Sequence, residues 1–125
     1  MPNTKKHILI VEDEIFVSEL YQEQLEKAGF NTTVAGNGKE ALNCLNEHVP
    51  DLILLDLVMP GMNGFELLEM LQKDDDWKKI KVVVLSNLSQ DTDKIKCKEF
   101  GVCHFMIKTK VSVEDVITEV KRRCN

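Results

Sequence analysis

Short, unbroken apolar runs that alternate with helical segments restrict the fold of this chain more than any other feature. Four runs consist almost only of aliphatic residues and span 8–11, 52–55, 82–85 and 105–107. Each run is too short for a helix and lacks polar alternation, which is typical of strands covered on both faces. The half-polar segment 31–35 is interpreted as an edge strand.

The segments between the runs have helical periodicity. The first carries one apolar stripe that stops at Gly29 and consists of Val17, Leu20, Tyr21, Leu25 and Ala28. Further helices are expected after Asn37, over 65–71, over 94–100 and after Ser112. Asn37 and Ser112 are each followed, three residues later, by an acidic residue, which is the spacing of a helix N-terminal capping box.

Five strands, each followed by a helix, predict an α/β fold. The expected architecture is a doubly wound five-stranded parallel sheet with five helices covering both faces. A length of 125 residues suffices for one domain, with a folded core over about 6–124. No output domain is expected to follow the last helix.

Composition excludes several classes of function. The net charge of -5 disfavours direct binding to nucleic acid. No run approaches the ~20 apolar residues of a membrane helix, so no membrane association is expected. The first apolar run is too short for a signal peptide, and the four cysteines contain no C-x-x-C pair. A cytoplasmic, reducing location is therefore predicted.

Polar residues follow the apolar runs directly. Glu12 and Asp13 follow the first run, Asp56 the second, Ser86 the third and Lys108 the last. Because the carboxyl ends of parallel strands share one edge of a sheet, these groups are expected to converge. Several carboxylates at one place require a cation, and oxygen ligands of this kind suit Mg²⁺, which commonly accompanies phosphate.

Each of these residues also has an ordinary structural explanation. The acids favour a helix N-terminus, Asp56 favours a turn, Ser86 is a loop hydroxyl and Lys108 is a surface charge. Their joint position after separate strands instead favours one phosphoryl-transfer site.

These residues resemble the receiver domain of two-component response regulators. The resemblance covers essentially the whole chain and is most specific around Asp56, in the sequence Leu-Asp-Leu-Val-Met-Pro-Gly-Met-Asn-Gly at 55–64. It implies a flavodoxin-like, CheY-like sheet with the strand order 2-1-3-4-5.

The resemblance also implies a role for each residue. Asp56 would accept a phosphoryl group from a histidine kinase or a histidine phosphotransfer protein. Lys108 would pair first with Asp56 and then with that group. Mg²⁺ would be held by Glu12, Asp13, Asp56 and the backbone carbonyl of Val58. Beyond self-phosphorylation and self-dephosphorylation, the chain is not expected to be an enzyme.

Signalling in this family implies a switch made by Ser86 and Phe105, although Phe105 also suits plain core packing. The switch would change the surface formed by the fourth helix, the fifth strand and the fifth helix. That surface is expected to bind a downstream partner or output domain, or to form a phosphorylation-dependent homodimer.

Two positions depart from the family pattern. Lys108 is followed by Thr109 where the family usually has a proline after a cis peptide. A cis bond before a non-proline residue costs about 3 kcal/mol, so a trans bond with a shifted loop or a strained bond is expected. Asn87 replaces the usual Ala or Gly, and is expected to narrow the site or to bind the phosphoryl group.

Three other functions would use some of the same features of the sequence. A receiver that only docks or dimerises would leave the pocket unused. An aspartyl-phosphate phosphatase would also place a nucleophilic Asp after a strand, but its usual Asp-x-Asp-Gly-Thr signature is missing at Asp56. A nucleotide or flavin carrier would need glycines and backbone amides where this chain has Glu12 and Asp13.

Overall fold

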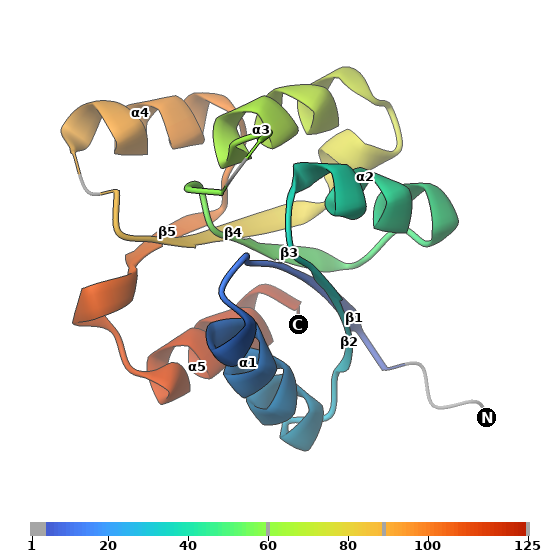
Figure 1. The fold of residues 1–125 in the computed structure, drawn as a ribbon, viewed down its shortest axis with the longest axis vertical. Coiled ribbons are helices and arrows are strands. Elements are labelled where there is room, and N and C mark those ends of the chain that lie inside the picture. The colour runs from blue at the N-terminus through green and yellow to red at the C-terminus, as the bar shows by residue number, and fades with distance from the viewer. Residues whose placement is uncertain (1–4, 60, 89, 125) are drawn as a thin grey trace.

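A computed structural model describes residues 5–59, 61–88 and 90–124 and has the expected alternation of strands and helices (Figure 1). The strands are β1 (His7–Val11), β2 (Asn31–Ala35), β3 (Leu52–Leu55), β4 (Lys81–Ser86) and β5 (His104–Ile107). The helices are α1 (Ile15–Lys27), α2 (Gly38–Glu47), α3 (Gly64–Lys73), α4 (Asp91–Glu99) and α5 (Val113–Cys124). Two short 3₁₀ turns are η1 (Trp77–Lys79) and η2 (Lys108–Lys110).

The sheet is parallel throughout and has the order β2-β1-β3-β4-β5. The predicted fold class and strand order are therefore confirmed, with the half-polar strand β2 at one edge. Figure 1 shows α1 and α5 on one side of the sheet and α2, α3 and α4 on the other.

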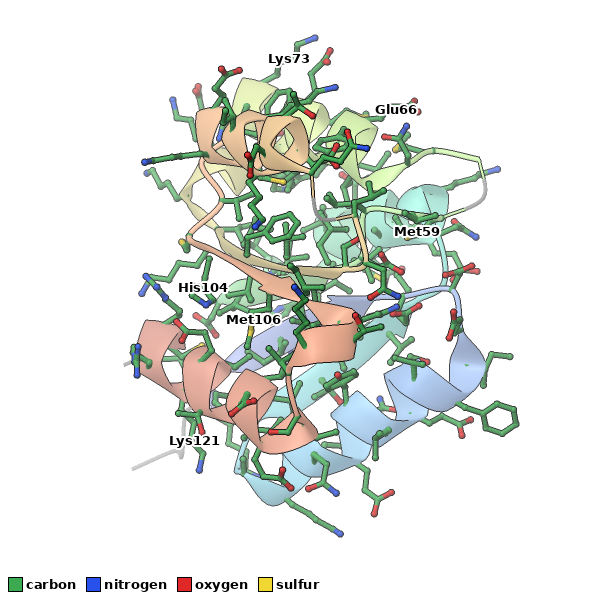
Figure 2. All side chains as sticks on the ribbon, turned by 90° about the vertical axis from the view of Figure 1, so that its left-hand side faces the viewer. Met59, Glu66, Lys73, His104, Met106 and Lys121 are labelled. Carbon is green, nitrogen blue, oxygen red and sulfur yellow. The ribbon has the colours of Figure 1, made fainter. Side chains whose placement is uncertain are left out.

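The central strands β1, β3 and β4 are apolar on both faces because helices cover both faces of the sheet. In β1, Leu9 and Val11 belong to the core cluster beneath α2, α3 and α4. Ile8 and Ile10 belong to the other cluster, beneath α1 and α5. Figure 2 shows Met106 of β5 between the sheet and α5, where it joins this second cluster. Unbroken apolar runs are thus explained by burial on both sides.

Two helices differ from the sequence prediction. In α1, Leu20 is 43% exposed, and the buried positions are Ser18, Tyr21 and Leu25. The Ser18 hydroxyl donates to the backbone carbonyl of Ile15 at 2.9 Å, which satisfies it inside the core. Helix α4 begins at Asp91 rather than at residue 94, because its first turn is polar and contributes no apolar periodicity.

The predicted helix caps are present. The Ser112 side chain accepts the Asp115 N–H at 3.0 Å, and the Asp115 carboxylate accepts the Ser112 N–H at 2.9 Å. The Asn37 side chain accepts the Glu40 N–H at 2.8 Å. The Glu40 carboxylate accepts the N–H of Gly36 rather than that of Asn37, so this end is only half of a capping box.

Two of the histidines lie in contact although they are distant in the sequence. The sequence pattern suggests that His7 and His48 lie far apart, but their ring centroids are 4.7 Å apart in an edge-on contact. The contact forms because β1 begins where α2 ends, at the same edge of the sheet.

Within the described residues, no helix combines the length and the apolar character that crossing a membrane requires.

The first residue of α3 is predicted to tolerate no side chain. A Cβ on Gly64 would lie 2.6 Å from the Cα of Leu57, a backbone atom that cannot move away cheaply. A Cβ on Gly38, the first residue of α2, would meet only the side chain of Met62. Gly64→Ala should therefore lower the free energy of urea unfolding by about 1–3 kcal/mol. Gly38→Ala should cost less, and equal losses in the two variants would contradict this account.

Candidate functional site

The strand register brings the predicted polar residues to one edge of the sheet. Val11 pairs with Leu55, so the residues that follow them, Glu12 and Asp56, are neighbours. The Asp56 N–H continues this ladder by donating to the Val11 carbonyl at 3.0 Å. Ser86 pairs with Ile107, which places the next residue, Lys108, at the same edge.

Three carboxylates gather at this edge. Glu12, Asp13 and Asp56 each offer an oxygen, and these oxygens lie within 4.8 Å of one another. Glu12 and Asp56 are only 5% and 7% exposed, whereas Asp13 faces solvent. No other trio of His, Cys, Asp or Glu side chains converges in this way among the described residues. The set offers hard oxygen ligands and fits a divalent cation such as Mg²⁺.

Lys108 supplies the positive charge within this cluster. Its Nζ lies 2.5 Å from Glu12 Oε1 and 3.1 Å from Asp56 Oδ2, and its side chain is only 14% exposed. Burial by itself lowers the pKa of the Lys108 ammonium, but hydrogen bonds to Glu12 and Asp56 outweigh burial and raise it. The ammonium therefore stays charged and holds two buried carboxylates together.

A pocket of about 220 Å³ opens beside Asp56. Its lining combines acidic, basic, amide and apolar side chains, which are Asp13, Glu14, Asp56, Val58, Asn87 and Lys108. The Val58 N–H donates to Asp56 Oδ1 at 3.1 Å and so orients the carboxylate, while the Val58 side chain is 54% exposed. The pocket is large enough for a phosphoryl group to reach Asp56 from solvent.

Ser86 ends β4 and Phe105 lies within β5, and neither lines the pocket. Ser86 is fully buried, and its hydroxyl accepts the Leu88 N–H at 3.3 Å. Phe105 is half-buried and packs against the core cluster beneath α2, α3 and α4. Their roles as switch residues stay predictions.

The peptide bond after Lys108 could be trans or strained, because the usual proline is missing. The Lys108–Thr109 peptide is trans, and Lys108 begins the short turn η2. The Thr109 N–H donates to Asn87 Oδ1 at 3.2 Å. The two departures from the family pattern are thus joined by a hydrogen bond.

Sequence reasoning did not assign a role to two further residues. Glu14 lines the pocket, and its N–H donates to Glu12 Oε2 at 3.1 Å. Tyr21 was assigned only to the apolar stripe of α1, but together with Glu12 and Asp56 it borders a small cavity. Glu14 belongs to the acidic run after the first strand and was expected at this edge without a role of its own, whereas no pattern in the sequence sets Tyr21 apart from its apolar neighbours.

The chain matches the family model for the response regulator receiver domain over residues 8–121. It belongs to that family. It is 33% identical to the polar-differentiation response regulator DivK of Brucella anthropi, over 93% of this chain and 94% of DivK. It is 31% identical to the probable transcriptional regulator ycf27 of Guillardia theta over 98% of this chain, which spans only 48% of that protein.

A solved structure agrees with these relatives. The signal receiver domain of a signal transduction histidine kinase from Syntrophus aciditrophicus is 34% identical, with a TM-score of 0.86 over 95% of this chain and 89% of that one. As a receiver domain, the chain is a signalling module of a two-component system rather than a catalytic enzyme. The acidic cluster of Glu12, Asp13 and Asp56 is consistent with a receiver phosphorylation site.

Removing the Lys108 ammonium should strengthen Mg²⁺ binding. A cation beside the three carboxylates repels a second cation, so Lys108→Met should raise the Mg²⁺ affinity about fivefold. Isothermal titration calorimetry measures this change. Lys110→Met is the matched control, because Lys110 is an exposed lysine in the same turn. An unchanged affinity in Lys108→Met would show that the ammonium does not compete with the metal.

Proposed function

We propose that this receiver domain accepts a phosphoryl group on Asp56 in a Mg²⁺-dependent reaction and passes the change to the surface formed by α4, β5 and α5. One observation carries the proposal. Asp56 is a buried carboxylate that adjoins two further acids, pairs with Lys108 and still borders a pocket open to solvent. A structural ion pair alone needs neither the additional acids nor the pocket.

The metal-binding part of the proposal uses oxygen ligands. Asp13, Asp56 and the backbone carbonyl of Val58 would hold Mg²⁺, and Glu12 would contact it directly or through water. When bound, the ion neutralises negative charge on the transferring oxygens. Glu12 is also paired with Lys108, so it balances the ammonium as well as contributing to the acidic cluster.

In the transfer, a carboxylate oxygen of Asp56 would attack the phosphorus of a phosphohistidine. The phosphorus–nitrogen bond breaks, the imidazole leaves, and Asp56 becomes an acyl phosphate. The donor would be a histidine kinase or a histidine phosphotransfer protein. The Val58 N–H, which donates to Asp56 Oδ1, restricts the carboxylate, and Lys108 then pairs with the new phosphoryl oxygens.

The response would pass through β4 and β5. Ser86 would exchange its bond with the Leu88 N–H for one with the phosphoryl group, and Phe105 would turn toward the space that the hydroxyl leaves. Because Ser86 is paired with Ile107, a shift at the end of β4 reaches β5 directly. The changed surface of α4, β5 and α5 would then bind a downstream partner or an output domain, or form a homodimer.

Phosphorylation at Asp56 is tested by intact mass after treatment with acetyl phosphate and Mg²⁺. The protein should gain the mass of one phosphoryl group, and Asp56→Asn should gain none. Asp51→Asn is the matched control, because Asp51 lies at the opposite end of the same strand. Modification of Asp56→Asn would remove Asp56 from its role, and an unmodified wild-type protein would favour a receiver that only docks or dimerises.

Self-dephosphorylation is predicted to be slow. The side chains two residues beyond Asp56 and Ser86 are Val58 and Leu88, and neither offers a hydrogen bond to an attacking water. Val58→Asn, which adds an amide beside Asp56, should accelerate loss of the phosphoryl group at least severalfold, by orienting that water. Val58→Leu keeps the position apolar and serves as the control. Loss of phosphate is followed by intact mass in Mg²⁺ buffer, and fast loss from the wild-type protein would contradict the prediction.

A further inference from the structure

The backbone of Lys108 lies just beyond the end of the sheet, where few neighbouring elements can fix its position. It follows β5, an edge strand whose neighbour in the sheet is β4. The two residues after it, Thr109 and Lys110, are exposed and bury little surface. Apolar packing therefore contributes little at these two residues, and a turn without other contacts would let the Lys108 side chain occupy several positions.

Asn87 provides such a contact. It follows Ser86 at the end of β4, lines the pocket beside Asp56, and accepts the Thr109 N–H at 3.2 Å. A backbone N–H can only donate, so the Asn87 atom in this bond is the carbonyl oxygen Oδ1. The bond requires a residue other than proline after Lys108, because proline has no N–H.

We propose that Asn87 is a positioning residue, which accepts the Thr109 N–H and thereby fixes the turn that aims Lys108 at the phosphoryl group. This inference rests on the proposed function, because the aim of Lys108 matters only when Asp56 carries that group. Asn87 and Thr109 act as a pair, because Asn87 supplies the acceptor oxygen and Thr109 supplies the N–H donor.

The bond itself is tested by amide hydrogen exchange at Thr109, followed by NMR. Asn87→Ala removes the acceptor and should accelerate exchange at Thr109 about twofold to tenfold, the factor that the net free energy of one hydrogen bond supplies. Asn87→Asp keeps an acceptor oxygen and should retain slow exchange. Gln90→Ala is the control. Gln90 lies in the same loop, and its exposed side-chain amide makes no capping hydrogen bond to α4. Exchange at Thr109 that is equally fast in the wild-type protein and Asn87→Ala would overturn the inference.

The effect on Lys108 is tested with beryllium fluoride, a phosphoryl analogue, in the presence of Mg²⁺. Asn87→Ala should weaken its binding about fivefold and should not weaken the affinity for Mg²⁺ alone, because a less fixed Lys108 ammonium repels the metal no more strongly than before. General destabilisation would weaken the binding of both ligands. In a Lys108→Ala background, Asn87→Ala should cause no further loss, because Asn87 acts through Lys108. The full loss in that background, or no loss in the Asn87→Ala single variant, would overturn the inference.

Beryllium fluoride binding distinguishes a failure of Asp56 phosphorylation from a failure of the Asn87 positioning role. If the wild-type protein binds no beryllium fluoride and accepts no phosphoryl group, the proposed function fails, and the role of Asn87 in aiming Lys108 fails with it. If the wild-type protein binds the analogue and Asn87→Ala binds it equally well, only the positioning role of Asn87 fails.

Discussion

The arrangement depends on one electrostatic constraint, which is that two carboxylates buried side by side need a positive charge. Glu12 and Asp56 are almost fully removed from solvent at the end of β1 and β3. Taking such groups out of water costs several kcal/mol each unless an ion pair and hydrogen bonds offset the loss. Lys108 contacts both, and the N–H groups of Glu14 and Val58 each donate to one of them. The site is stable in this form and remains attractive to a divalent cation.

The sheet makes this concentration of charge possible. The central strands β1, β3 and β4 are covered on both faces, so their polar neighbours in the sequence lie at the strand ends. Because all the strands run in parallel, those ends share an edge, and residues about 50 positions apart in the chain become neighbours. The two positions that depart from the family pattern, Asn87 and Thr109, belong to the same edge and are joined for the same reason.

The sequence predicted much of the fold, the convergence of the acids at one edge of the sheet and the pairing of Lys108 with Asp56. It did not predict the contact of Lys108 with Glu12. The five strands, the capping residues of α5 and the acids at the sheet edge follow from local patterns. The buried face of α1 does not, because Ser18 is buried through a local hydrogen bond while Leu20 is exposed. The contact between His7 and His48 was also missed, since it depends on where a helix ends relative to a neighbouring strand.

By itself, the sequence determined which chemical groups stand at the strand ends, because a run of apolar residues must end where polar residues begin. Only the tertiary structure decided how those groups are paired. Lys108 bridges Glu12 and Asp56, Ser86 is bonded to its own loop, and Asn87 rather than Ser86 borders the pocket. The reason is physical: strand periodicity is a local property, whereas the partner of a buried charge depends on the strand order and register of the whole sheet.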